Sequence, residues 1–68
     1  MRVSARNKLP GVVSDIQSDG LMAKVSVRLG DNHIVALVTA ESVAELELKV
    51  GDNVTALIKS TSVMLAKG

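Results

Sequence analysis

Two short segments, one near each end of the chain, concentrate side chains that can donate hydrogen bonds. They are residues 4–7 (Ser-Ala-Arg-Asn) and residues 59–62 (Lys-Ser-Thr-Ser). Each segment combines one cation with hydroxyl or amide groups, and neither contains a carboxylate. A doubly charged tetrahedral oxyanion presents only hydrogen-bond acceptors, so a site for it must be built from donors of this kind. The two segments therefore fit an oxyanion site, and they also fit two ordinary polar surface loops.

Residues that enzymes commonly use as bases and nucleophiles are scarce in this chain. There is no cysteine, and the single histidine, His33, stands among polar neighbours in a predicted turn. Nucleophilic catalysis needs a nucleophile beside a positioned base, and a zinc site needs several histidine or cysteine ligands. The seven acidic residues form no recognisable acid–base pair, and the five glycines form no phosphate-binding loop. We therefore expect neither an enzyme nor a metal ion bound directly by side chains.

The composition also argues against nucleic-acid and membrane partners. The formal net charge is +1, and the chain contains no Phe, Tyr or Trp. Proteins that bind single-stranded nucleic acid usually combine a basic groove with aromatic stacking platforms. No apolar run approaches the ~20 residues of a spanning helix, and the charged first ten residues do not resemble a signal peptide. We expect a cytoplasmic protein that binds neither nucleic acid nor membrane.

Hydrophobic periodicity predicts a chain built mostly of strands. Every odd-numbered residue from Leu21 to Leu29 is apolar, which is the period-two pattern of a half-buried strand. Asp19-Gly20 before this strand and residues 30–32 after it are typical of tight turns. Gly11 indicates a bulge or a bend within the strand predicted over residues 9–17. The other predicted strands are residues 9–17, 34–39, 53–59 and 62–66.

One helix is expected between the third and fourth strands. Ser42-Val43-Ala44-Glu45 fits the capping box that opens a helix, with Val43, Leu46 and Leu48 facing the core. Five short strands with one helix in this position are the order of an OB-like barrel. The predicted fold is therefore all-β, a single OB-like domain over residues 1–68.

The size of the chain predicts association with other copies. A domain of 68 residues buries only about 60% of the surface that its unfolded chain exposes. A core without aromatic rings has little bulk, so apolar surface is left for a subunit interface. The run of residues 34–39 is apolar on both faces up to Thr39, which also indicates an interface. We expect a homo-oligomer.

Three segments, taken together, resemble the molbindin (Mop) family of molybdate-binding domains. They are residues 4–11 (SARNKLPG), which resemble the family's opening, residues 38–43 (VTAESV), which resemble its strand-to-helix junction, and residues 59–64 (KSTSVM), which resemble its closing motif. The match covers nearly the whole chain in the right order. The length of the chain also resembles that of the family members that consist of this domain alone.

The resemblance implies a function and a set of site residues. The chain would bind, store and buffer molybdate or tungstate, with the anions held between the subunits of a hexamer that is a trimer of dimers. Ser4, Arg6 and Lys59 match the family's anion-binding positions. A second type of site would lie near the oligomer axis. The full set of expected residues is Ser4, Arg6, Asn7, Thr39, Ser42, Lys59 and Ser60. Ser60 and Thr39 would be neighbours of the first site, from the same or an adjoining chain, and Asn7 would support its loop. Thr39 and Ser42 are also the residues expected at the second site.

Two alternative functions remain open at the level of sequence. OB barrels often bind single-stranded nucleic acid, so the chain could be a nucleic-acid-binding module. It could also be a pure oligomerisation or regulatory domain that binds no small ligand.

Overall fold

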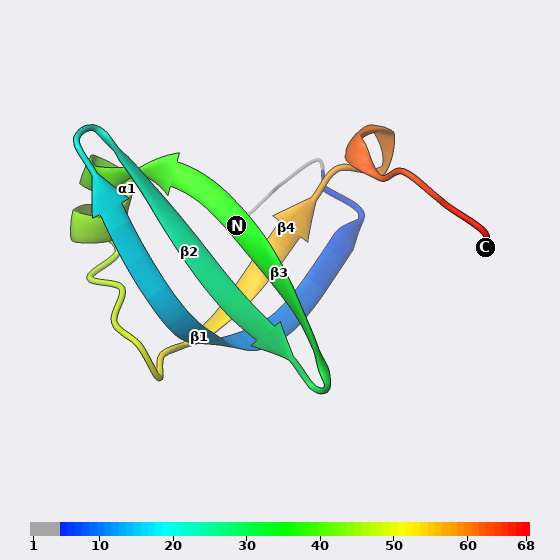
Figure 1. The fold of residues 1–68 in the computed structure, drawn as a ribbon, viewed down its shortest axis with the longest axis horizontal. Coiled ribbons are helices and arrows are strands. Elements are labelled where there is room, and N and C mark those ends of the chain that lie inside the picture. Colours follow the sequence, from blue (N-terminus) through cyan, green and yellow to red (C-terminus); the bar gives the residue numbers. More distant parts are fainter. Residues whose placement is uncertain (1–4) are drawn as a thin grey trace.

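The computed structural model describes residues 5–68, which form one curled antiparallel sheet with a short helix at one end (Figure 1). The sheet has four strands in the order β3-β2-β1-β4. The elements are β1 (Asn7–Asp19), β2 (Met22–Leu29), β3 (Asn32–Thr39), α1 (Ala40–Glu45), β4 (Asn53–Ile58) and a 3-10 turn (Ser60–Ser62). The OB-like all-β architecture expected from the sequence is confirmed, with four strands in place of five.

The sheet curls because β1 pairs with two neighbours at different points along its length. Its second part, from Val12 to Asp19, pairs with β2, and its first part, from Asn7 to Val12, pairs with β4. The register with β2 shifts between Val13 and Asp15, which is a β-bulge. A bulge bends the strand that carries it and increases the local twist. β1 can therefore turn away from β2 and continue along β4 (Figure 1).

Gly11 lies next to the residue at which β1 changes partner. A Cβ added there would lie 2.6 Å from the backbone oxygen of Arg28 and 2.6 Å from Cδ2 of Leu29. The backbone of Gly11 does not adopt a positive φ, so space rather than conformation requires the glycine. The expected bend is confirmed, while the register irregularity itself lies at Val13–Asp15, beyond the glycine.

A small valine cluster fills the inside of the curled sheet. Val13, Val25 and Val27 are at most 5% exposed, and Ala23 is buried beside them. The inward face predicted for residues 21–29 is therefore confirmed at its centre. The prediction is wrong at Leu21, which is 87% exposed because it lies in the hairpin loop between β1 and β2.

The helix begins earlier than the sequence predicts, because Thr39 and not Ser42 caps it. The Oγ1 atom of Thr39 accepts a hydrogen bond of 3.0 Å from the backbone N–H of Ser42, and the helix starts at Ala40. Thr39 ends β3 in an extended conformation, which is the backbone geometry of an N-cap. Val43 and Leu48 pack against the valine cluster as expected, whereas Leu46 is 69% exposed.

The fifth predicted strand, at residues 62–66, is not formed. The chain makes the 3-10 turn after β4 and then continues as an exposed tail. Met64 and Leu65 are 92% and 94% exposed. A strand is held by hydrogen bonds to a neighbour, and within residues 5–68 no strand lies alongside this tail. The apolar pattern of residues 62–66 is therefore not enough by itself to form a strand.

The close approach at Gly11 generates a first prediction. We expect Gly11→Ala to lower the free energy of unfolding by about 1–3 kcal/mol, because an added methyl group in a packed position forces the backbone to shift. Urea unfolding at one protein concentration measures the loss. Gly68→Ala is the control, since nothing lies within 4 Å of that position. Equal stability of the two variants would show that β1 and β2 can separate freely at this point.

Candidate functional site

The pairing of β1 with β4 brings the two donor segments together. Asn7 is the register partner of Ile58, so Arg6, which precedes Asn7, and Lys59, which follows Ile58, lie at the same end of this strand pair. Arg6 and Lys59 are both exposed. The register therefore places two cations from opposite ends of the sequence at one edge of the molecule. Ser4 lies outside the described residues.

Asn7 has a structural role at this point. Its Nδ2 atom donates a hydrogen bond of 3.1 Å to the backbone oxygen of Ile58, and the side chain is half-buried. The bond ties the first residue of β1 to the last residue of β4. The expectation that Asn7 supports the loop fits this contact, because one of its two amide hydrogens is already used.

The segment after β4 presents its polar groups on a tight turn. Lys59 is extended, and its backbone oxygen accepts a hydrogen bond of 2.9 Å from the N–H of Ser62. Ser60, Thr61 and Ser62 form the turn, and all three are exposed. Each of these short hydroxyl side chains can donate a hydrogen bond to an anion.

The other expected residues, Thr39 and Ser42, lie together but far from this edge. Their hydroxyl oxygens are 2.7 Å apart, and both belong to the start of α1. Thr39 pairs with Met22, and the backbone N–H of Ala40 donates to the oxygen of Leu21, so the helix start is fixed to the β1–β2 hairpin loop. In Figure 1 this helix and the 3-10 turn lie at opposite ends of the sheet. A single chain therefore does not bring the Thr39 and Ser42 hydroxyls close to Arg6 and Lys59.

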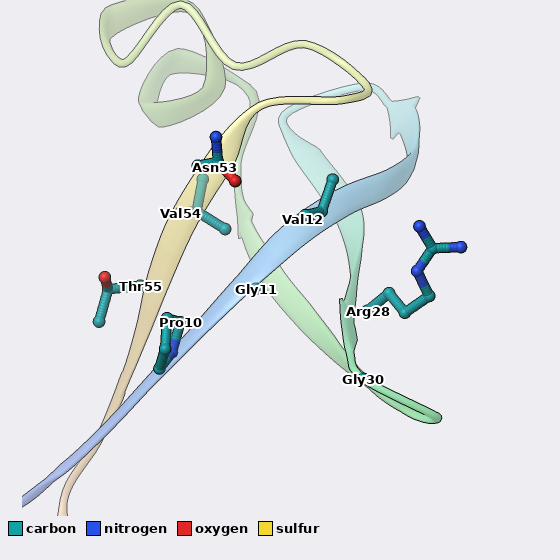
Figure 2. Close-up of a pocket in the computed structure, with 8 residues that line it drawn as sticks. All are labelled: Pro10, Gly11, Val12, Arg28, Gly30, Asn53, Val54 and Thr55. Carbon is teal, nitrogen blue, oxygen red and sulfur yellow. The ribbon is translucent and has the colours of Figure 1, made fainter.

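A separate surface hollow lies beside the bend of β1, and no sequence pattern predicted it (Figure 2). Arg28, Asn53 and Thr55 contribute polar side chains to its lining, and Arg28 is the only cation among its lining residues. Figure 2 shows the Arg28 side chain extending away from Asn53 and Thr55. The lining comes from strands that meet only through the curl of the sheet, so no sequence motif marks the hollow. The full lining is Pro10, Gly11, Val12, Arg28, Gly30, Asn53, Val54 and Thr55.

Two further features of the described part of the chain limit its chemistry. Among residues 5–68, no group of three or more His, Cys, Asp or Glu side chains is placed to hold a metal ion. In the same part of the chain, α1 has six residues, and no helix is long and apolar enough to cross a membrane. The donors at the β1–β4 edge are of the kind that can hydrogen-bond to an anion.

Comparison with protein families and sequences gives whole-length matches. Residues 3–65 match the TOBE domain family. Molybdenum-pterin-binding protein 1 of Clostridium pasteurianum is 41% identical over 66 residues, which are 96% of this chain and 97% of that protein. Molybdenum transport protein ModE of Azotobacter vinelandii is 44% identical over 66 residues, but the chain spans only 24% of the length of ModE.

Comparison with solved structures gives molybdate-binding proteins. A molybdate-binding protein from Sporomusa ovata superimposes with a TM-score of 0.94 and 42% identity, over 98% of this chain and 100% of that one. The cytoplasmic molybdate-binding protein ModG, crystallised with molybdate bound, gives a TM-score of 0.83 and 43% identity over 88% of this chain and 43% of ModG. These relatives are named as binding proteins and not as enzymes.

The family match and the whole-length relatives together confirm the resemblance found in the three sequence segments. The match extends over 63 of the 68 residues, from 3 to 65, and identities of about 40% hold over nearly the full length. The chain belongs to the TOBE domain family and is a homologue of the molybdenum-pterin-binding (Mop) proteins.

Proposed function

We propose that this protein binds molybdate or tungstate reversibly, without catalysing a reaction, and acts as a cytoplasmic store that buffers the anion. The observation that carries the proposal is the likeness to the molybdate-binding protein of Sporomusa ovata over the whole of both chains, at 42% identity. The exposed cations and hydroxyls at the β1–β4 edge supply donors suited to a dianion.

The primary site would use Ser4, Arg6, Lys59 and Ser60, with Asn7 holding the loop in place. No Asp or Glu occurs in residues 4–8 or 59–62, so the segments themselves add no charge that repels the anion. Charge-assisted hydrogen bonds are roughly twice as strong as neutral ones, which favours a doubly charged ligand at such a site.

We further propose that the anion sites form where subunits of a homo-oligomer meet, in a hexamer built as a trimer of dimers. Thr39 and Ser42 belong to the start of α1, which lies at the opposite end of the sheet from the 3-10 turn that follows Lys59 (Figure 1). A single chain cannot bring both groups to one anion, whereas two neighbouring copies can. Thr39 and Ser42 would then serve an adjoining chain or a second type of site near the oligomer axis.

Anion selectivity follows from a site made of donors. Phosphate near neutral pH usually carries a proton, and that proton needs an acceptor which such a site does not offer. A buried donor left unpaired in this way costs about 1–3 kcal/mol. Sulfate is fully ionised but smaller than molybdate, so it reaches the same donors less well. Tungstate is nearly the same size as molybdate and should bind similarly.

Calorimetric titration with four anions tests the proposal. We expect molybdate and tungstate to bind with similar affinity, and phosphate to bind about 5- to 140-fold more weakly, given a mismatch of about 1–3 kcal/mol. A ligand that binds only the folded oligomer also raises its melting temperature by mass action. Phosphate binding as tightly as molybdate would overturn the donor-only site.

Substitution of the two cations tests the site residues. We expect Arg6→Ala and Lys59→Ala each to weaken molybdate binding by about 10- to 100-fold, because a hydrogen bond to a charged group contributes about 1.5–3 kcal/mol. Lys24→Ala is the matched control, since Lys24 is an exposed lysine on β2 away from the β1–β4 edge. Circular dichroism checks that each variant remains folded. Unchanged affinity in both site variants would place the anion elsewhere.

A second candidate, a regulatory or assembly module, is favoured by one observation. The matched region makes up only 24% of ModE, so the same domain occurs inside a larger protein. Equilibrium dialysis separates the two functions, because an oligomer that retains no molybdate or tungstate would support a pure assembly role. A gel shift that weakens steeply with salt would instead support nucleic-acid binding.

A further inference from the structure

Lys8 lies on the same face of the sheet as Lys59, although it is not among the residues assigned to the anion site. Lys8 is the register partner of Leu57, and residues directly opposite each other in an antiparallel pair share one face. Lys59 follows Leu57 by two residues and has an extended backbone, with φ −65° and ψ 141°. Because side chains of an extended backbone alternate between the two faces, Lys59 points to the face that carries Lys8.

The two lysines are close enough to act on one ligand. They are diagonal neighbours across the β1–β4 pair, and such neighbours lie about 7–8 Å apart, within reach of long side chains. Both are exposed, and Lys8 lines a hollow beside β4 together with Leu57. Arg6 precedes Lys8 by two residues and is exposed as well. Three cations therefore gather at the end of the pair where β1 begins and β4 ends (Figure 1).

The strand segments that carry these cations contain no acidic residue to balance them. All seven acidic residues of the chain lie in residues 15–52. Residues 1–14 and 53–68, which include the whole β1–β4 pairing, hold five of the eight basic residues and no acidic one. Like charges on neighbouring strands destabilise a sheet, so this cluster does not help the fold. Departures from such a local rule are expected at functional sites.

We propose that Lys8 is a third cation of the oxyanion site and makes the site select its ligand by charge. This role rests on the proposed function, and it adds to the same site a residue and a basis for selectivity. The Coulomb energy between a lysine and an anion is proportional to the charge of the anion. Lys8 therefore attracts a doubly charged tetrahedral anion twice as strongly as a singly charged anion of the same size.

Perrhenate separates charge from size, because it is a tetrahedral anion of nearly the size of tungstate that carries one charge less. The test compares both anions on the wild type and on Lys8→Gln, which removes the charge and keeps a hydrogen-bond donor. Calorimetric titration at low ionic strength measures tungstate, and competition against tungstate measures perrhenate. We expect Lys8→Gln to weaken tungstate binding about 3- to 30-fold and perrhenate binding only by the square root of that factor. Added salt should reduce both losses, since exposed charges are screened.

Two variants serve as controls. Lys24→Gln removes the same charge from an exposed position on β2, where the register partners are Gln17 and Leu37. Lys8→Arg keeps the charge at the proposed position. We expect both variants to bind tungstate within about twofold of the wild type, because distant exposed charges are screened and an arginine supplies the same charge as a lysine.

The stability of the anion-free protein distinguishes a ligand role from a structural role. Removal of one of three neighbouring cations relieves repulsion between strands. We therefore expect anion-free Lys8→Gln, at low salt, to melt at the wild-type temperature or above it. A structural Lys8 would instead lower the melting temperature, and it would lower the affinities for both anions by the same factor.

Failure of this proposal and failure of the proposed function give different results. A wild type that binds neither molybdate nor tungstate rejects the function, and the role of Lys8 with it. A wild type that binds tungstate while Lys8→Gln binds it equally well rejects only the role of Lys8. Equal losses for tungstate and perrhenate, an equal loss in Lys24→Gln, or a lower melting temperature of anion-free Lys8→Gln would each reject that role too. If perrhenate binds too weakly to measure, the tungstate affinities of Lys8→Gln and Lys24→Gln decide.

Discussion

The pairing of β1 with β4 is the contact on which the rest of the molecule depends. Along the chain, β1 pairs first with β4, up to Val12, and then with β2. Gly11 allows the close approach of the backbones that this change of partner requires. The same pairing curls the sheet around its valine cluster and sets the start of β1 beside the end of β4. The hydrogen bond from Asn7 to Ile58 holds that end in place. A single pairing therefore produces both the fold and the juxtaposition of Arg6 with Lys59.

The core inside this sheet is small, and that has consequences for the function. Only Val13, Ala23, Val25 and Val27 are fully buried hydrophobic residues among those described. Any ligand or partner that binds only the folded form of so small a domain would add to its stability. Exposed apolar residues on β3, Val35 at 54% and Leu37 at 69%, and in the tail show where burial is still missing. Ligand binding, assembly and folding are therefore expected to be coupled.

Polar side chains that could bind an anion occur in two separate places on the molecule. One edge carries Arg6 and Lys59 with the hydroxyls of the turn, and the opposite end of the sheet carries the Thr39–Ser42 pair. The Thr39 hydroxyl donates to the Ser42 hydroxyl and accepts from the backbone N–H of Ser42, so its first task is to start α1. The exposed cations have no comparable structural task in the fold described. This division explains why the β1–β4 edge is the stronger candidate for the anion, and why the helix start would contribute only where copies meet.

Local patterns in the sequence determined much of this protein. The alternation in residues 21–29 predicted the buried face of β2, because in a strand the side of the sheet that a residue faces depends only on its position. The donor segments and the family resemblance also came from sequence alone. The helix start came out wrong because Thr39 and Ser42 are both good caps, and the end of β3 decided between them. The fifth strand was predicted but is absent, since a strand exists only with a partner. Likewise, only the tertiary structure joined Asn7 to Ile58 across 51 residues of sequence. Side-chain alternation is a property of each segment, whereas hydrogen bonds between strands depend on which distant segment arrives beside it.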